Sequence, residues 1–392
     1  MRLVLVLLAA LVLAMPIEVK AQSPTLLRDA ILSDNPLRTG ANFNIVANNA
    51  NAATQEGLFS APDEFGTSYF FRGTHTGLNN NVIFAGYQWK ILRIEGNGNI
   101  RLIYNGVCPD NDCGINGNLA AAAATIGSAA FNQPVNQNRL MGYMFGSLTG
   151  TFDEVHANIN SSNVKQIVDS WFDNNIVGTD RPIVATNTTF CNDRSLVSGT
   201  GLGIDATTFG AMGRLPGGTT GNVPTLICPR TEDRLSLTNG LTFPVGLLTA
   251  DEASMAGGRS GASNGDLFLR TGQLFWTMSP GVSNGTNARM ITVISNGNIM
   301  NDLISWSGTG IRPVLSLRSN VTVTGDGSLS DPYIVTGLYE PVDPGNPGGN
   351  NGGSQGGENN YNPPTSVPGL LTYGALAAGS LAALTLISRR KK

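Results

Sequence analysis

The chain has 392 residues, only 13% of them charged, and a formal net charge of −3. A nucleic-acid-binding protein needs a basic face, and 24 Lys and Arg against 27 Asp and Glu do not favour one. Hydrophobic residues make up 41% of the chain, too many for a disordered protein, and 49 glycines predict frequent turns. We therefore expect a folded, strand-rich protein with no nucleic-acid partner.

Residues 1–21 are typical of a secretory signal peptide. Arg2 precedes an apolar run from Leu3 to Met15, and Val19 and Ala21 occupy the −3 and −1 positions of a cleavage site before Gln22. The apolar run is short for a transmembrane helix, which needs about 20 residues. The pattern predicts export.

Residues 22–60 are predicted to form an N-terminal helix and a polar connector. Ser23 and Pro24 suit the N-cap and first position of a short helix. The apolar residues Leu26, Leu27, Ala30 and Ile31 follow it, and a stretch rich in Asn and Ala runs from residue 47 to 55. We expect residues 61–336 to form the extracellular domain and to fold alone.

This domain is predicted to be α+β, mostly antiparallel β-hairpins with a few short helices. Residues 87–94 and 100–104 alternate around a Gly/Asn turn, and residues 289–294 turn at Asn296-Gly297 into another strand. Val164, Ile167, Val168 and Trp171 recur at helical spacing after Ser161 and Ser162, and Thr249 to Glu252 is a capping box.

The four cysteines are expected to form disulfides, because exported proteins meet oxidising conditions. Cys108 and Cys113 flank a turn-like tetrapeptide, and Cys191 would then pair with Cys228. This pairing is preferred by proximity, and reduced, packed thiols are the alternative. His75 and His156 lack metal-ligand spacing, so we expect no metal and no cofactor.

The C-terminal region combines a linker with an anchor. Residues 337–361 are rich in Gly, Pro and Asn and are predicted to be a spacer. Residues 367–388 carry no charge and are long enough to span a membrane as a helix, and the basic residues 389–392 follow. The basic tail indicates a cytoplasmic end, with the rest of the protein outside.

Before this span stands the pentapeptide Asn362, Pro363, Pro364, Thr365, Ser366. Pentapeptide, apolar span and basic tail together resemble the sorting signal of Gram-positive surface proteins. The resemblance implies that sortase cuts after Thr365 and joins it to cell-wall peptidoglycan, with Asn362 and Pro363 as recognition residues. Ser366 departs from the family's glycine, and a plain membrane anchor is the alternative.

Nine short stretches resemble an uncharacterised extracellular module of Gram-positive-type surface and prepilin-like proteins, over residues 25–336. They are residues 69–72, 84–89, 93–104, 142–146, 190–194, 246–252, 275–280, 310–317 and 331–335. A more distant similarity links the chain to C-type-lectin-like and sulfatase-modifying folds. The resemblance implies no catalytic residues.

The leading hypothesis is a surface protein that binds or adheres, with a glycan or a host or neighbouring cell surface as partner. Trp276 and Trp306 are candidates for stacking on a glycan. The alternatives are an exported enzyme of the sulfatase-modifying type that uses Cys191 and Cys228 with copper, and a pilin-like structural subunit.

A pilus backbone requires an exposed lysine amine as acceptor. Apart from Lys20 and the two C-terminal lysines, the chain has Lys90 and Lys165. Strand alternation could turn Lys90 outward, and we expect Lys165 on the solvent face of its helix. With Lys165 as the one serious candidate, polymerisation is not expected.

Overall fold

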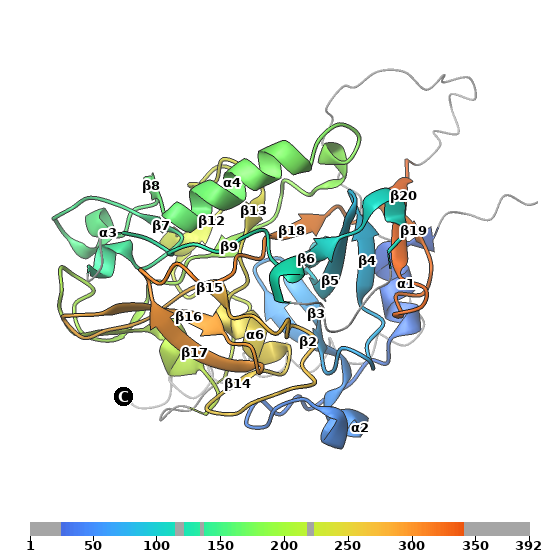
Figure 1. Cartoon of the computed structure of the whole chain (residues 1–392), viewed down its shortest axis with the longest axis horizontal. Helices are drawn as coiled ribbons and strands as arrows, with labels where there is room; N and C mark the ends of the chain where they lie inside the picture. Colours follow the sequence, from blue (N-terminus) through green and yellow to red (C-terminus); the bar gives the residue numbers. More distant parts are fainter. Residues whose placement is uncertain (1–24, 114–120, 134–136, 218–222, 341–392) are drawn as a thin grey trace, which may run out of the picture. The chain divides into compact units, whose positions relative to one another are not determined.

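Two β-sheets organise the part of the chain that the computed structural model describes, residues 25–113, 121–133, 137–217 and 223–340 (Figure 1). Within these residues the larger sheet has ten strands. Its main path runs β1 (Thr25–Leu26), β19 (Val321–Thr324), β20 (Tyr333–Leu338), β4 (Asn81–Phe84), β5 (Tyr87–Ile94), β6 (Ile100–Val107), β18 (Val314–Leu317) and β13 (Val245–Gly246). The hairpin of β2 (Gly57–Asp63) and β3 (Gly66–Arg72) joins this path through β5.

The second sheet has six strands, which come from residues 196–303. Its order is β10 (Leu196–Ser198), β11 (Thr207–Phe209), β15 (Phe275–Ser283), β16 (Ala288–Val293), β17 (Asn298–Leu303) and β14 (Arg259–Ser260). Two further pairs are β7 (Met144–Phe145) with β8 (Asn160–Ser161), and β9 (Phe190–Cys191) with β12 (Arg234–Leu235). All named strand pairs are antiparallel except β4 with β20 and β14 with β17.

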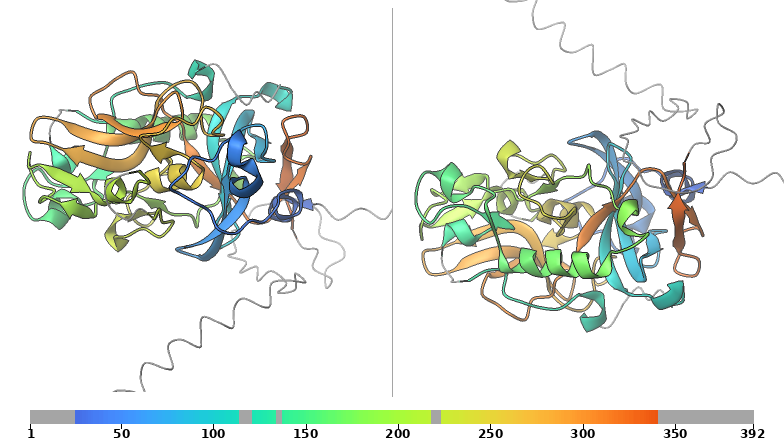
Figure 2. Two further views of the ribbon diagram at one scale, coloured as in Figure 1. Left: turned by 90° about the horizontal axis from the view of Figure 1, so that it is seen from below. Right: turned by 90° about the horizontal axis from the view of Figure 1, so that it is seen from above.

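Six short α-helices are described. They are α1 (Leu27–Asp34), α2 (Ala52–Gln55), α3 (Phe152–Val155), α4 (Asn163–Asn175), α5 (Gly210–Arg214) and α6 (Ala250–Met255). Helix α4 packs on β13, while α6 contacts β3 of the first sheet and β15, β16 and β17 of the second (Figure 2). Helix α6 therefore connects the two sheets, and the α+β class expected from the sequence is confirmed.

The local patterns read from the sequence form as expected. Strands β5 and β6 pair around the Gly/Asn turn, and β16 pairs with β17 around Gly297, whose φ of +79° suits glycine. Ser162 caps α4 by accepting from the Lys165 amide at 3.1 Å, and Thr249 and Glu252 form the capping box of α6.

The N-terminal segment is part of the core. Leu27 and Ile31 of α1 are 0% exposed, and strand β2 begins at Gly57, four residues before the domain start expected from the sequence. Helix α1 begins at Leu27 rather than near Pro24, because Leu26 is paired in β1. At the other end, β20 continues to Leu338, two residues into the expected linker.

Both lysines inside the domain are buried, which corrects the expectation that they could reach solvent. Lys165 and Lys90 are each 0% exposed. The Lys165 ammonium forms an ion pair with Asp169 at 2.6 Å and lies near the Tyr143 ring, so its side of α4 is covered. The Lys90 ammonium donates to the Oδ1 atom of Asn81 on the facing strand β4.

We expect residues 25–340 to unfold cooperatively as a fragment and residues 61–340 to fail to do so. The shorter fragment cuts β2 and loses Leu27, Ile31, Leu58 and Phe59, all at most 2% exposed. Burying four such side chains contributes about 6–12 kcal/mol, comparable to the whole stability of a domain. Thermal unfolding followed by circular dichroism, after expression in an oxidising compartment, tests this. Equal melting temperatures would contradict it.

Lys90 should make stability depend on pH. Burial, with a smaller effect of Arg312, lowers its pKa from 10.5 to about 7. Between these values the unfolded chain binds a proton that the folded chain does not, so stability rises with pH, by about 2–3 kcal/mol from pH 7 to pH 9. In urea unfolding, the free energy of unfolding of Lys90→Met should rise less from pH 7 to pH 9 than that of the wild type, by about the same 2–3 kcal/mol. An equal rise in the two proteins would contradict the assignment.

Candidate functional site

Both expected disulfides are present. Cys108 bonds to Cys113 and Cys191 to Cys228, and the described residues contain no free cysteine. The pairing predicted from proximity is confirmed, and the alternative of packed thiols is not. Two disulfides fit a protein of an oxidising, extracellular environment.

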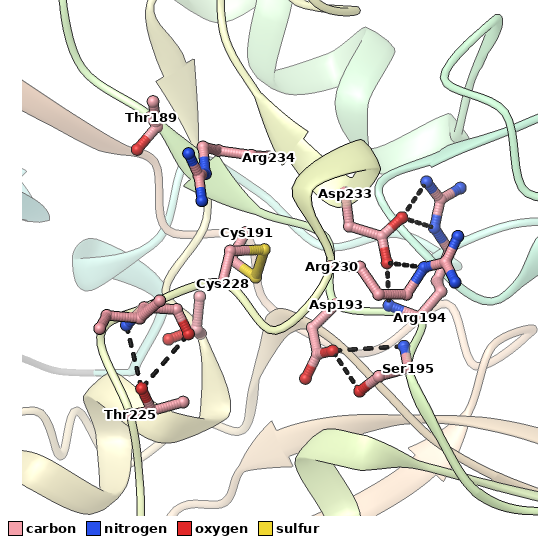
Figure 3. The surroundings of a disulfide bond; sticks show 12 residues. Thr189, Cys191, Asp193, Arg194, Ser195, Thr225, Cys228, Arg230, Asp233 and Arg234 are labelled. Atoms are coloured by element: carbon pink, nitrogen blue, oxygen red, sulfur yellow. Dashed lines mark hydrogen bonds and ion pairs between the residues drawn. A yellow bond between two sulfur atoms is a disulfide. The ribbon is translucent and has the colours of Figure 1, made fainter. Parts of the chain in front are cut away.

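The Cys191–Cys228 disulfide ties β9 to the loop of residues 223–230 (Figure 3). Beside it, the Arg194 guanidinium donates to Asp233 Oδ1 from Nε at 2.9 Å and from Nη2 at 2.6 Å, and the Arg194 amide donates to Oδ2. Asp193 accepts from the Ser195 hydroxyl at 2.6 Å, and Thr225 donates its amide to Asp251 at 3.0 Å. The loop is thus fixed by covalent and charged contacts.

A network of buried ion pairs lies behind this loop. Arg93 contacts Asp63 at 2.6 Å and Glu252 at 3.2 Å, while Arg101 contacts Glu95 at 2.9 Å. Burial by itself would raise the pKa of Glu95, but Arg101 and Arg93 hold it below its ordinary value. The carboxylates of the network therefore have guanidinium partners already.

The charged side chains and the disulfide enclose a cavity of only about 30 Å³, lined in part by Arg93, Asp193, Cys228 and Glu252. A cavity of this size holds about one water molecule. Because its charges are paired within the protein and its volume is so small, we assign this region a structural role.

A larger cleft lies at the other disulfide, and we call it the β20 cleft. Four segments line it: the β4–β5 turn with Ala85 and Gly86, Asn111 of the Cys108–Cys113 loop, residues 179–183, and residues 335–338 of β20. Its volume is about 460 Å³. This lies within the range of about 300–1,000 Å³ typical of small-ligand sites.

Two of these walls hold non-glycine residues in the left-handed region. Ala85 has φ of 55° and Asn111 has φ of 58°. A conformation of this kind costs about 1–2 kcal/mol for a residue such as alanine, and it persists where surrounding structure imposes it. At Ala85 the cause is the tight two-residue turn, and at Asn111 it is the loop closed by Cys108 and Cys113.

Three polar side chains of the cleft have no partners of their own, whereas the Thr336 hydroxyl is hydrogen-bonded to that of Thr322 at 2.9 Å. Among the described residues, no hydrogen bond or ion pair reaches the side chains of Asn111, Thr179 or Asp180, which all line the cleft. Burial raises the pKa of Asp180 above its ordinary value. The neighbouring Arg181 does not neutralise it, since its Nε donates to the Ile176 carbonyl at 2.6 Å and its Nη2 pairs with Asp173 at 3.0 Å.

The two candidate tryptophans have different outcomes. Trp276 is 0% exposed, donates its indole N–H to the Ala129 carbonyl at 2.9 Å and packs on Phe131, so it cannot stack on a ligand. Trp306 is 53% exposed but lines neither cavity. The sequence analysis did not select the residues of the β20 cleft as candidates. They come from four segments that are far apart in the sequence, so no local motif brings them together.

The expected terminal signals, including Ala21, Gln22 and the motif from Asn362 to Ser366, lie outside the described residues. Among the residues that are described, no helix has both the length and the apolar character needed to cross a membrane. Comparison with protein-family models, with curated proteins and with solved structures finds no match.

The two disulfides should differ in their contribution to stability. Cys191 and Cys228 are 37 positions apart and Cys108 and Cys113 only 5, so the first closes a much longer loop. In the chain-entropy treatment, the longer loop contributes about 4 kcal/mol and the shorter one about 2 kcal/mol. Replacing each pair by serines and measuring urea unfolding tests this order. An equal or reversed loss would contradict it.

Proposed function

We propose that this protein is displayed on the cell surface and that its extracellular domain binds a ligand in the β20 cleft. The observation that carries the proposal is an open cleft of ligand size in which Asn111, Thr179 and Asp180 have no protein partner among the described residues. Polar groups that lie in a cleft without partners are available to a ligand. The two disulfides support an extracellular location for this site.

The terminal sequences support attachment as well as export. The leader, the pentapeptide ending in Ser366, the uncharged stretch 367–388 and the basic tail occur in the order of a sortase signal. In this proposal sortase joins Thr365 to peptidoglycan, and the membrane span alone is the second possibility. A C-type-lectin-like relationship of the domain and membership of the surface-protein module belong to the same proposal.

The two alternatives have less support. An oxidase of the sulfatase-modifying type would need Cys191 and Cys228 as thiols, and their sulfur atoms are bonded to each other. A pilus subunit would need an accessible lysine, and Lys90 and Lys165 are both buried and hydrogen-bonded. Binding is therefore the function we favour.

Thr365→Ala should release the protein from the cell wall. Alanine keeps the backbone carbonyl that would be transferred, but it lacks the threonine side chain of the sorting motif, so sortase should not cleave the variant. The chain should then shift from the wall fraction into the detergent-extractable membrane fraction. Thr372→Ala, which changes another threonine inside the apolar stretch, should stay in the wall fraction. Fractionation of cells with immunoblotting measures this. If the wild-type chain is itself extracted by detergent, the plain membrane anchor is correct.

Ligand binding is tested with the exported chain on an array of glycans and peptides. The proposed function predicts saturable binding to at least one class of probe.

Surface display is tested by protease treatment of intact cells, which should remove the domain. A chain that resists protease on intact cells would contradict surface display.

A further inference from the structure

We infer that the β20 cleft binds an extended peptide that places a lysine side chain against Asp180 and pairs its backbone with β20. This inference rests on the proposed function and names its ligand. Three features of the cleft carry it: an unpaired strand segment, a carboxylate without a counter-ion, and an aliphatic wall.

The first feature is the free side of β20. Strand β4 pairs with β20 only at Tyr333 and Ile334, because β4 ends at Phe84 and the chain turns at Ala85 and Gly86. On the other side of β20, Val335, Gly337 and Leu338 pair with β19, and Thr336 is the extra residue of a bulge. Their side toward the cleft therefore has no strand partner among the described residues, and an extended peptide can add there by backbone hydrogen bonds. Four residues span about 13 Å, enough for a peptide of similar length.

The second feature is the negative charge of Asp180. Its carboxylate lines the cleft and has no cation or hydrogen-bond donor among the described residues, while Arg181 beside it is engaged elsewhere. A partly buried carboxylate without a partner favours a ligand that brings a positive charge. The raised pKa of Asp180 agrees with this, because burial there is not compensated.

The third feature selects the kind of cation. The same cleft has an apolar wall, which is formed by Ile83, Pro182, Ile183, Val335 and Leu338. Aliphatic surface next to a single carboxylate suits a side chain with a methylene stem and a charged end. A lysine in an extended peptide meets all three conditions, since the backbone pairs with β20, the stem covers the aliphatic wall and the ammonium reaches Asp180.

The test uses the full-length protein in detergent and three N-acetylated, C-amidated pentapeptides. These are Ala-Val-Lys-Val-Ala, the same peptide with norleucine in place of lysine, and the lysine peptide with N-methylated valines, which cannot donate backbone hydrogen bonds. Free 1,5-diaminopentane serves as the non-peptide amine. Isothermal titration calorimetry measures each affinity.

The lysine peptide should bind, and the norleucine and N-methylated peptides should each bind at least about tenfold more weakly, the size expected for loss of a charge-assisted bond or several backbone bonds. Asp180→Asn should weaken the lysine peptide by about 10- to 100-fold. The matched control is Asp110→Asn, which removes a carboxylate next to Asn111 at a backbone φ of 55° that asparagine tolerates, and it should change affinity by less than about twofold. Unfolding temperatures of both variants confirm that they fold.

Equal binding of the norleucine peptide, or an unchanged affinity of Asp180→Asn, would overturn the role of the carboxylate. Equal binding of diaminopentane and of the N-methylated peptide would overturn strand addition and indicate a site for free amines. If no peptide or amine binds while a glycan does, this inference is wrong and the proposed binding function stands. If the array gives no ligand of any class and the domain is not displayed, the proposed function itself fails.

Discussion

The carboxylate of Glu252 joins the helix between the sheets to the centre of the larger sheet. Its Oε2 atom accepts from the Thr249 amide at 3.0 Å and caps α6, while its Oε1 atom lies 3.2 Å from Arg93 Nε and 3.5 Å from Arg101 Nε. Because these charges are buried, each needs its partner, and removing one leaves another unpaired at a cost of about 3–5 kcal/mol. The position of α6, and through it the approach of the second sheet, depends on this arrangement.

The buried Arg72 side chain also holds separate segments of the domain together by hydrogen bonds. Arg72 is 0% exposed and donates to the carbonyls of Ser254 and Met255 at the end of α6, and also to the carbonyls of Asn42 and Ile45 in the N-terminal segment. A planar guanidinium with five donors can satisfy several carbonyls at once. The N-terminal segment is thereby held to the core by polar contacts as well as by its buried Leu27 and Ile31.

The β20 cleft arises from a difference in strand length. Strand β20 continues to Leu338, whereas β4 leaves the sheet at a tight turn after Phe84, so the sheet has a gap at that position. The Cys108–Cys113 loop and residues 179–183 form the walls of this gap. In our proposal the rigid disulfide-bonded scaffold presents this short open strand segment and the Asp180 carboxylate to a ligand outside the cell.

Local sequence patterns determined the elements that depend on near neighbours along the chain. The hairpins β5–β6 and β16–β17, the capping box of α6, the α4 stripe and the disulfide between Cys108 and Cys113 all follow from residues a few positions apart, whose geometry is fixed by turn chemistry and period. The terminal signals are likewise read from the sequence alone, and they lie outside the described residues.

Tertiary structure decided what surrounds each element. The period of α4 shows which face is most apolar, but it cannot show that Tyr143, from outside the helix, lies against the Lys165 ammonium. The sequence also does not show whether Trp276 is exposed. In the fold it packs on Phe131 and donates to the Ala129 carbonyl, so it is buried. The β20 cleft is lined by segments that lie between residue 83 and residue 338, and no local sequence pattern predicts that they are in contact. Burial and the pairing of charges are set by contacts distant in sequence, and for this reason they emerge only in the folded chain.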